Sequence, residues 1–118
     1  MRGESHPQSC GALSDLRVVE CAQMVSGPFC GKLLADQGAQ VIKVEPPQGD
    51  VARAEGPFPG DVPHPERSGL FFYLNTNKLG ITLNLHSPRG KRILRQLVRQ
   101  ADILVENYPP KEANTLGL

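Results

Sequence analysis

The chain has 118 residues, of which 39% are hydrophobic, and its 13 basic and 12 acidic side chains nearly cancel. This balance creates no global field that would favour nucleic acid or a membrane surface as a partner. Two Tyr, four Phe and no Trp also leave few rings on which single-stranded bases could stack. We therefore expect one modest domain with no nucleic-acid partner and no membrane partner.

The N-terminal residues and the cysteines indicate the compartment. Residues 1–13 are polar and are predicted to form a flexible leader, and they lack the apolar run of a secretory signal. Cys10, Cys21 and Cys30 are odd in number and form no CxxC pair, which favours a reducing compartment. We expect a cytoplasmic protein, and a mitochondrial or peroxisomal location stays open.

The first half of the chain has the pattern strand–helix–strand. "LRVVECA" (Leu16–Ala22) is a short apolar run typical of a buried strand. Gly27 and Pro28 suit a helix start, and Gly38 suits a helix end. "AQVIKVE" (39–45) follows as a second strand. The short connections predict two parallel strands with a right-handed crossover.

A connection rich in proline and glycine separates the two halves. Residues 46–70 hold six of the eleven prolines. A structureless segment this long inside a compact domain is more often functional or disordered than a plain linker. "LFFYLNTNK" (Leu70–Lys78) follows and fits either a short helix or an extended segment.

The second half repeats the strand–helix–strand pattern. "GITLNL" (80–85) alternates apolar and polar residues, as a strand does. Ser87 and Pro88 are typical of a helix start, and "DILVEN" (102–107) is a fourth strand. The helix between them has arginines on one face and an apolar stripe on the other, formed by Ile93, Leu94, Leu97, Val98 and Ala101. The fold class is therefore α/β: a Rossmann-like parallel sheet with flanking helices, whose strand order the sequence does not define.

The residues alone do not favour a dinucleotide site. Glu45 ends the second strand, where a Rossmann protein places its ribose-binding acid. However, "SGPFCG" supplies only Gly27 and Gly31, so the G-x-G-x-x-G motif is absent, and no P-loop motif occurs. The first helix start could hold an anion, but simple helix capping is the favoured interpretation.

Catalytic cysteine and metal chemistry are also disfavoured. Cys30 lies in the first turn of the predicted helix, where a thiolate can be activated, but packing against the sheet is the favoured interpretation. His6, His64 and His86 are scattered and have no Cys or His at metal-binding spacing. We predict neither a metal nor a permanently bound cofactor.

Six ordered motifs make the chain similar to a known family. They are the G-P turn, "LADQGAQVIKVE", the "GD" turn, "NTNK", the P-x-G of the second long helix, and "ADILVENYPP". Together they resemble the N-terminal part of the family III CoA-transferases, over Leu13–Leu118. This family includes formyl-CoA, carnitine-type and succinyl-CoA:dicarboxylate CoA-transferases and the related α-methylacyl-CoA racemases.

The resemblance implies a CoA-binding face beyond the carboxyl ends of the strands. Pro46 and Thr115 stand where some family members have a basic residue, which weakens any phosphate contact there. The implied CoA contacts are Val25, Ser26, Pro46, Leu83, Asn84, Leu85, His86, Asn107, Tyr108, Pro109 and Thr115.

The resemblance also implies the reaction and the assembly. Family transferases use an acylated aspartate that lies downstream of the "ENYPP" segment. Four aspartates in this chain belong to other motifs and are not substitutes: Asp36, Asp50, Asp61 and Asp102. We therefore expect no catalytic residue here, and we interpret 14–118 as the N-terminal portion of a larger domain, inactive alone. The implied substrates are an acyl-CoA and a carboxylic acid, and the implied assembly is an interlocked homodimer. Racemase or isomerase activity, or a non-catalytic nucleotide-binding module, are the alternatives.

Overall fold

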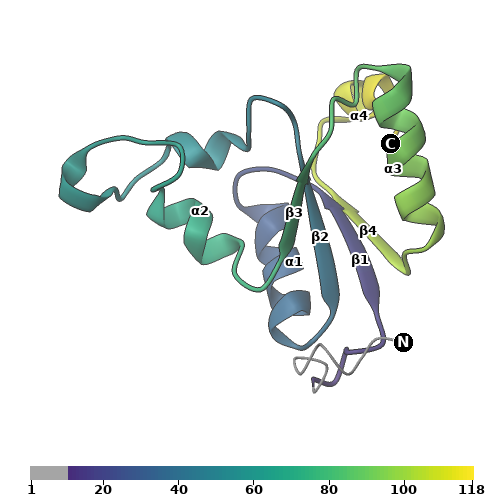
Figure 1. Cartoon of the computed structure of the whole chain (residues 1–118), viewed down its shortest axis with the longest axis horizontal. Helices are drawn as coiled ribbons and strands as arrows, with labels where there is room; N and C mark the ends of the chain where they lie inside the picture. Colours follow the sequence, from purple (N-terminus) through teal and green to yellow (C-terminus); the bar gives the residue numbers. More distant parts are fainter. Residues whose placement is uncertain (1–10) are drawn as a thin grey trace.

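The computed structural model describes residues 11–118, so His6 and Cys10 in the predicted leader lie outside the described residues. Four strands form one sheet in the order β3-β2-β1-β4, and every neighbouring pair is parallel (Figure 1). This confirms the predicted parallel α/β fold and supplies the strand order. The strands are β1 (Arg17–Cys21), β2 (Gln40–Glu45), β3 (Leu79–Thr82) and β4 (Ile103–Glu106).

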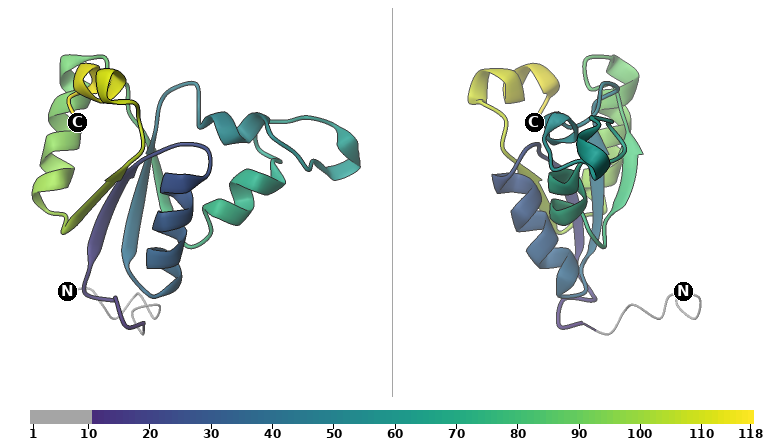
Figure 2. Two further views of the ribbon diagram at one scale, coloured as in Figure 1. Left: turned by 180° about the vertical axis from the view of Figure 1, so that it is seen from behind. Right: turned by 90° about the vertical axis from the view of Figure 1, so that its left-hand side faces the viewer.

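Helices cover both faces of the sheet. Helix α1 (Ser26–Asp36) lies on one face and α3 (Pro88–Arg99) on the other (Figure 2). Helix α4 (Pro110–Leu116) lies at the carboxyl end of the sheet, near the N-terminal end of α3 (Figure 1). Helix α2 (Gly69–Leu74) and the 3-10 turns η1 (Val51–Ala54) and η2 (Pro59–Asp61) form an arm that projects beside β3.

Several elements differ in detail from the predictions. The third strand ends at Thr82 because Asn84 turns the chain: its side chain accepts a hydrogen bond from His86 N, and its carbonyl accepts one from Ser87 N. Helix α1 begins at Ser26, and its N-cap residue, Val25, makes no capping side-chain hydrogen bond. The N-cap position is therefore Val25, two residues before Gly27, the residue that the sequence predicts there.

Two apolar layers hold the helices to the sheet, because side chains alternate between the faces of a strand. On the α1 face, Val18 and Val41 pack with Ala35 and Ala39. The opposite face buries a cluster formed by Val19, Cys21, Val44, Leu85, Leu94 and Leu116. Leu97, Val98 and Ala101 of the predicted stripe pack against that cluster, so α3 is oriented as the sequence predicted.

The sheet-facing side of α1 consists of small residues. Gly27, Pro28, Gly31 and Ala35 are its buried positions, and Cys30 is exposed. The prediction that Cys30 packs against the sheet is therefore wrong. Glycines at the contact let the α1 backbone approach the strands closely.

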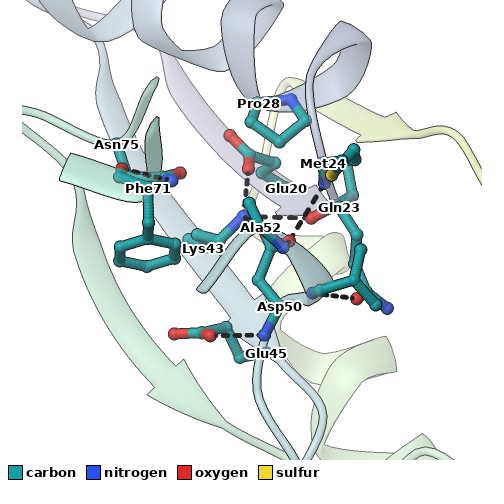
Figure 3. A network of polar contacts seen from close by, with 12 residues as sticks. Glu20, Gln23, Met24, Pro28, Lys43, Glu45, Asp50, Ala52, Phe71 and Asn75 are labelled. Atoms are coloured by element: carbon teal, nitrogen blue, oxygen red, sulfur yellow. Dashed lines mark hydrogen bonds and ion pairs between the residues drawn. The ribbon is translucent and has the colours of Figure 1, made fainter. Parts of the chain in front are cut away.

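A cluster of buried charges lies under α1. Glu20 and Lys43 occupy paired positions on β1 and β2, and both side chains are almost fully buried. Lys43 Nζ lies 3.0 Å from Glu20 Oε2 and 2.8 Å from Asp50 Oδ2, and it donates to Ala22 O (Figure 3). Lys78 Nζ lies 2.7 Å from Glu20 Oε1. We name these four residues, Glu20, Lys43, Asp50 and Lys78, the buried ion cluster.

The buried ion cluster is balanced in charge. Its two carboxylates and two ammonium groups cancel, which is the condition under which buried ions are tolerated. Lys78 also donates to Pro28 O and Asn75 Oδ1, both at 2.8 Å, and burial lowers its pKa although Glu20 opposes this shift. The cluster therefore connects two strands, α1, the segment after α2 and the loop after β2.

A substitution at Gly31 tests how closely α1 packs against the buried ion cluster. A Cβ added at Gly31 would collide with Oε1 of Glu20, so Gly31→Ala must displace a buried carboxylate or α1. We expect this substitution to lower the free energy of unfolding by about 1–3 kcal/mol, the usual effect of overpacking.

The matched control is Gly80→Ala, because a Cβ at Gly80 would meet no atom within 4 Å. Urea titrations of both variants should separate them, with the second close to wild type. Equal stabilities for the two variants would contradict the close contact between α1 and Glu20.

Candidate functional site

Glu45 at the end of β2 organises the loop that follows it. Its Oε2 accepts hydrogen bonds from Asp50 N (2.8 Å) and Arg53 Nε (2.7 Å), and its Oε1 accepts one from Arg53 Nη2 (2.7 Å). The Arg53 guanidinium also stacks on the Phe71 ring, 3.8 Å from its centroid. Both carboxylate oxygens of Glu45 are thus engaged within the protein, which argues against a role in holding a ribose.

The charge state of Glu45 reflects these contacts. Burial by itself would raise the pKa of Glu45, but the hydrogen bonds from Arg53 and from Asp50 N bring it below its ordinary value of 4.5. Glu45 is therefore an ionised residue that fixes the loop geometry.

Asp50 joins the loops that follow β1 and β2. Its Oδ1 accepts hydrogen bonds from Met24 N (3.0 Å) and from Ala52 N (2.8 Å), and the second of these caps η1. Its Oδ2 contacts Lys43 in the buried ion cluster. One buried carboxylate thus fixes both loops relative to the sheet (Figure 3).

Asn107, which follows β4, clamps the chain just before α1. Its Oδ1 accepts a hydrogen bond from Gln23 N (3.0 Å), while its Nδ2 donates to Gln23 O (2.8 Å) and to Ser26 Oγ (3.1 Å). Two residues predicted to contact CoA, Ser26 and Asn107, are therefore in direct contact with each other.

A pocket of about 250 Å³ lies where these loops meet, beyond the carboxyl ends of β2 and β3. Six of the eleven residues predicted to contact CoA line it: Pro46, Leu83, Asn84, Leu85, His86 and Tyr108. They come from three separate segments of the chain, which the fold brings to one place. Gln23, Val44, Pro47, Gln48, Glu112 and Leu116 complete the lining.

The other five predicted residues lie outside this pocket. Val25 and Ser26 start α1, Asn107 forms the clamp described above, and Pro109 is the N-cap residue of α4. Thr115 is exposed on α4, and its hydroxyl donates to Lys111 O. The structure thus divides the predicted contacts into a pocket group, a group at the starts of α1 and α4, and Thr115 in the last turn of α4.

Sequence reasoning missed two contributions to this site. The first is α4, which brings Glu112 and Leu116 to the pocket. Pro110 in its first turn and Gly117 in the left-handed conformation at its end are the signals that could have predicted it. The second is Gln23, which belongs to no recognisable sequence motif.

The structure also bears on cysteine chemistry, metal binding and membrane spanning. Burial raises the pKa of Cys21 to about 12, so its thiol is a packing group in the core. Within residues 11–118, no group of three or more His, Cys, Asp or Glu side chains is placed to bind a metal ion. In the same residues, no helix is long and apolar enough to cross a membrane.

A parallel sheet whose strand-end loops enclose a pocket defines an α/β ligand-binding layer of the Rossmann type. The profile of CoA-transferase family III matches residues 13–118, which is nearly all of the chain. The chain belongs to CoA-transferase family III, as the ordered motifs predicted.

Curated relatives and solved structures agree with this assignment. A succinyl-CoA:mesaconate CoA-transferase from Haloarcula marismortui is 43% identical over 83% of this chain and 25% of its own length. A formyl-CoA:oxalate CoA-transferase from Streptomyces coelicolor is 42% identical over 90% of this chain and 25% of its own length. The crystal structure of a CaiB/BaiF family protein from Brucella suis matches with a TM-score of 0.80 and 35% identity, over 92% of this chain and 29% of that protein. The chain spans about a quarter of the length of these curated relatives.

Glu45 predicts a specific pH dependence of stability. Because its pKa is lower in the folded protein than in the unfolded chain, ionised Glu45 stabilises the fold. This contribution is present above the ordinary value of 4.5 and is lost as the pH falls through the lower folded-state pKa. In urea titrations at a series of pH values, wild type should lose stability relative to Glu45→Gln as the pH falls below about 4.5.

An exposed acid provides the control for this experiment. Glu55→Gln removes a carboxylate outside the Glu45–Arg53 contact and should leave the pH profile close to that of wild type. A constant difference between wild type and Glu45→Gln across the series would show that the hydrogen-bonded carboxylate does not stabilise the loop.

Proposed function

We propose that the protein is a CoA-transferase that moves CoA between an acyl-CoA and a carboxylic acid. The residues described here supply part of its CoA-binding surface. The observation that carries the proposal is the pocket itself, because six predicted contact residues from three chain segments line it. The two curated relatives reported above are CoA-transferases, which favours this activity over racemase chemistry.

The pocket suits a part of CoA. At about 250 Å³ it lies just below the roughly 300–1,000 Å³ typical of sites that enclose a whole drug-sized ligand. Its lining includes the carboxylate of Glu112 but no Lys or Arg. A neutral part of the ligand, the adenine ring or the pantetheine arm, therefore fits the pocket better than the phosphates do.

Three of the five aspartates in residues 11–118 are better suited to structure than to catalysis. Asp50 is buried in ion pairs, Asp36 is bound by Lys32 and Asn77, and Asp102 accepts a hydrogen bond from Arg17 N. A nucleophile must reach the thioester carbonyl, and these carboxylates are already engaged. We therefore assign the acyl-accepting aspartate to another part of the full-length protein, and we assign binding to this part.

We also propose that the full-length protein forms a homodimer. Phe29 and Leu33 on α1 and Phe72 and Tyr73 on α2 are large apolar side chains that are exposed in the described residues. Covering such side chains in an assembly would remove apolar surface from water. Light scattering on the full-length protein should give a dimer, and a monodisperse monomer would contradict this proposal.

The proposed activity is tested with the full-length protein. Incubation with succinyl-CoA or formyl-CoA and a panel of carboxylic acids should yield a new acyl-CoA, detected by mass spectrometry. Absence of CoA exchange with every acid, together with no measurable binding of free CoA, would contradict the proposal.

A charge substitution tests the place of binding. His86 is an exposed residue of the pocket lining, so His86→Glu should repel the anionic CoA and raise its Kd about fivefold, as expected for a like charge at short range in partly aqueous surroundings. Gln96→Glu adds the same charge on the exposed side of α3 and should bind CoA as wild type does. Equal affinities for the two variants would place CoA elsewhere.

A further inference from the structure

Gln23 connects three loops through one side chain. It lies between β1 and α1 and contributes to the pocket lining. Its Nε2 donates a hydrogen bond to the Tyr108 hydroxyl at 3.1 Å, and its Oε1 accepts one from Val51 N at 2.9 Å. These partners follow β4 and β2 respectively, so the loops after three of the four strands meet at one amide.

The backbone of Gln23 is also fixed. The Asn107 side chain hydrogen-bonds to both the N–H and the carbonyl group of Gln23. These two bonds fix the position of the Gln23 backbone, from which its side chain extends. The next residue, Met24, adopts a left-handed φ of 70° and donates its N–H to Asp50. A residue held in this way places its side-chain amide at a set distance from the sheet.

The two side-chain contacts of Gln23 connect two chain segments that contribute to the pocket lining. Val51 continues the loop that contributes Pro46, Pro47 and Gln48 to the lining. Tyr108 lines the pocket together with two residues of α4. A side-chain amide suits this position because it offers a donor on one atom and an acceptor on the other.

We propose that Gln23 is a positioning residue that sets the separation of these two lining segments and thereby holds the pocket ready for CoA. This inference rests on the proposed function, because it assumes that the pocket receives CoA. Because the loop is already ordered in the free protein, binding does not have to offset the entropy cost of ordering it. The affinity for CoA is therefore higher.

A positioning role for Gln23 predicts a change in CoA affinity, whereas a purely structural role predicts a change in global stability. The Gln23–Val51 hydrogen bond is solvent-exposed, so water can replace it when the side chain is changed and global stability should fall little. Affinity for CoA, in contrast, should fall because the loop must then be ordered during binding.

The experiment uses the full-length protein and free coenzyme A as the probe. Gln23→Met keeps the length of the side chain and removes both hydrogen bonds. Isothermal titration calorimetry should show a rise in Kd for CoA of about fivefold, the value expected from roughly one net hydrogen bond. Thermal unfolding should show that the variant is folded at the titration temperature, and the control Gln96→Met changes an exposed glutamine of α3.

A second variant, Gln23→Glu, tests whether the hydrogen bonds of residue 23 order the loop in the absence of ligand. Gln23→Glu can still accept the Val51 N–H and can accept the Tyr108 hydroxyl proton, so the loop contacts are kept. In hydrogen exchange without ligand, the Val51 amide should be protected in wild type and in Gln23→Glu and should exchange faster in Gln23→Met.

The outcomes distinguish this inference from the proposed function. If wild type does not bind CoA, the proposed function fails. If wild type binds CoA and Gln23→Met has a Kd within twofold of it, or if Val51 exchange is the same in both proteins, the positioning role of Gln23 is wrong.

Discussion

The contact on which the rest of the structure depends is the ion pair between Glu20 and Lys43 under α1. Both side chains point to the α1 face of adjacent strands, where Gly31 leaves room for the Glu20 carboxylate. Removing one partner of a buried pair typically costs about 3–5 kcal/mol, because the other charge is left unpaired away from water. Asp50 and Lys78 extend this pair to the loop after β2 and to the segment after α2.

The buried ion cluster explains how a rigid core determines the geometry of an exposed site. Asp50 has one oxygen in the cluster and the other on Met24 N and Ala52 N, so the loops after β1 and β2 take their positions from Lys43. Glu45 and Arg53 then close the loop after β2. The loops after β1 and β2, which contribute to the pocket, are thus fixed to the sheet through charged side chains.

The sequence was sufficient to predict the elements whose pattern is local. Alternation in "GITLNL" and the apolar stripe of 93–101 identified a strand and a helix, and short connections identified the parallel pairing. The buried ion cluster was not predicted, because Glu20 and Lys43 look like ordinary polar positions of a strand until the register pairs them. The role of Gln23 was missed for the same reason: its partners are 28 and 85 residues away in the chain. Family motifs such as "NTNK" were visible in the sequence, but only the structure shows that Lys78 neutralises Glu20.

The central claim is that loops fixed by the buried ion cluster form the surface on which CoA binds. A crystal structure of the full-length protein with coenzyme A tests it most directly. We predict density for the ligand beyond the carboxyl ends of β2 and β3, with a neutral part of CoA inserted between Leu83–His86 and Tyr108 and with Lys43 still bound to Glu20 and Asp50. Density for CoA that contacts none of the residues lining this pocket would contradict the account.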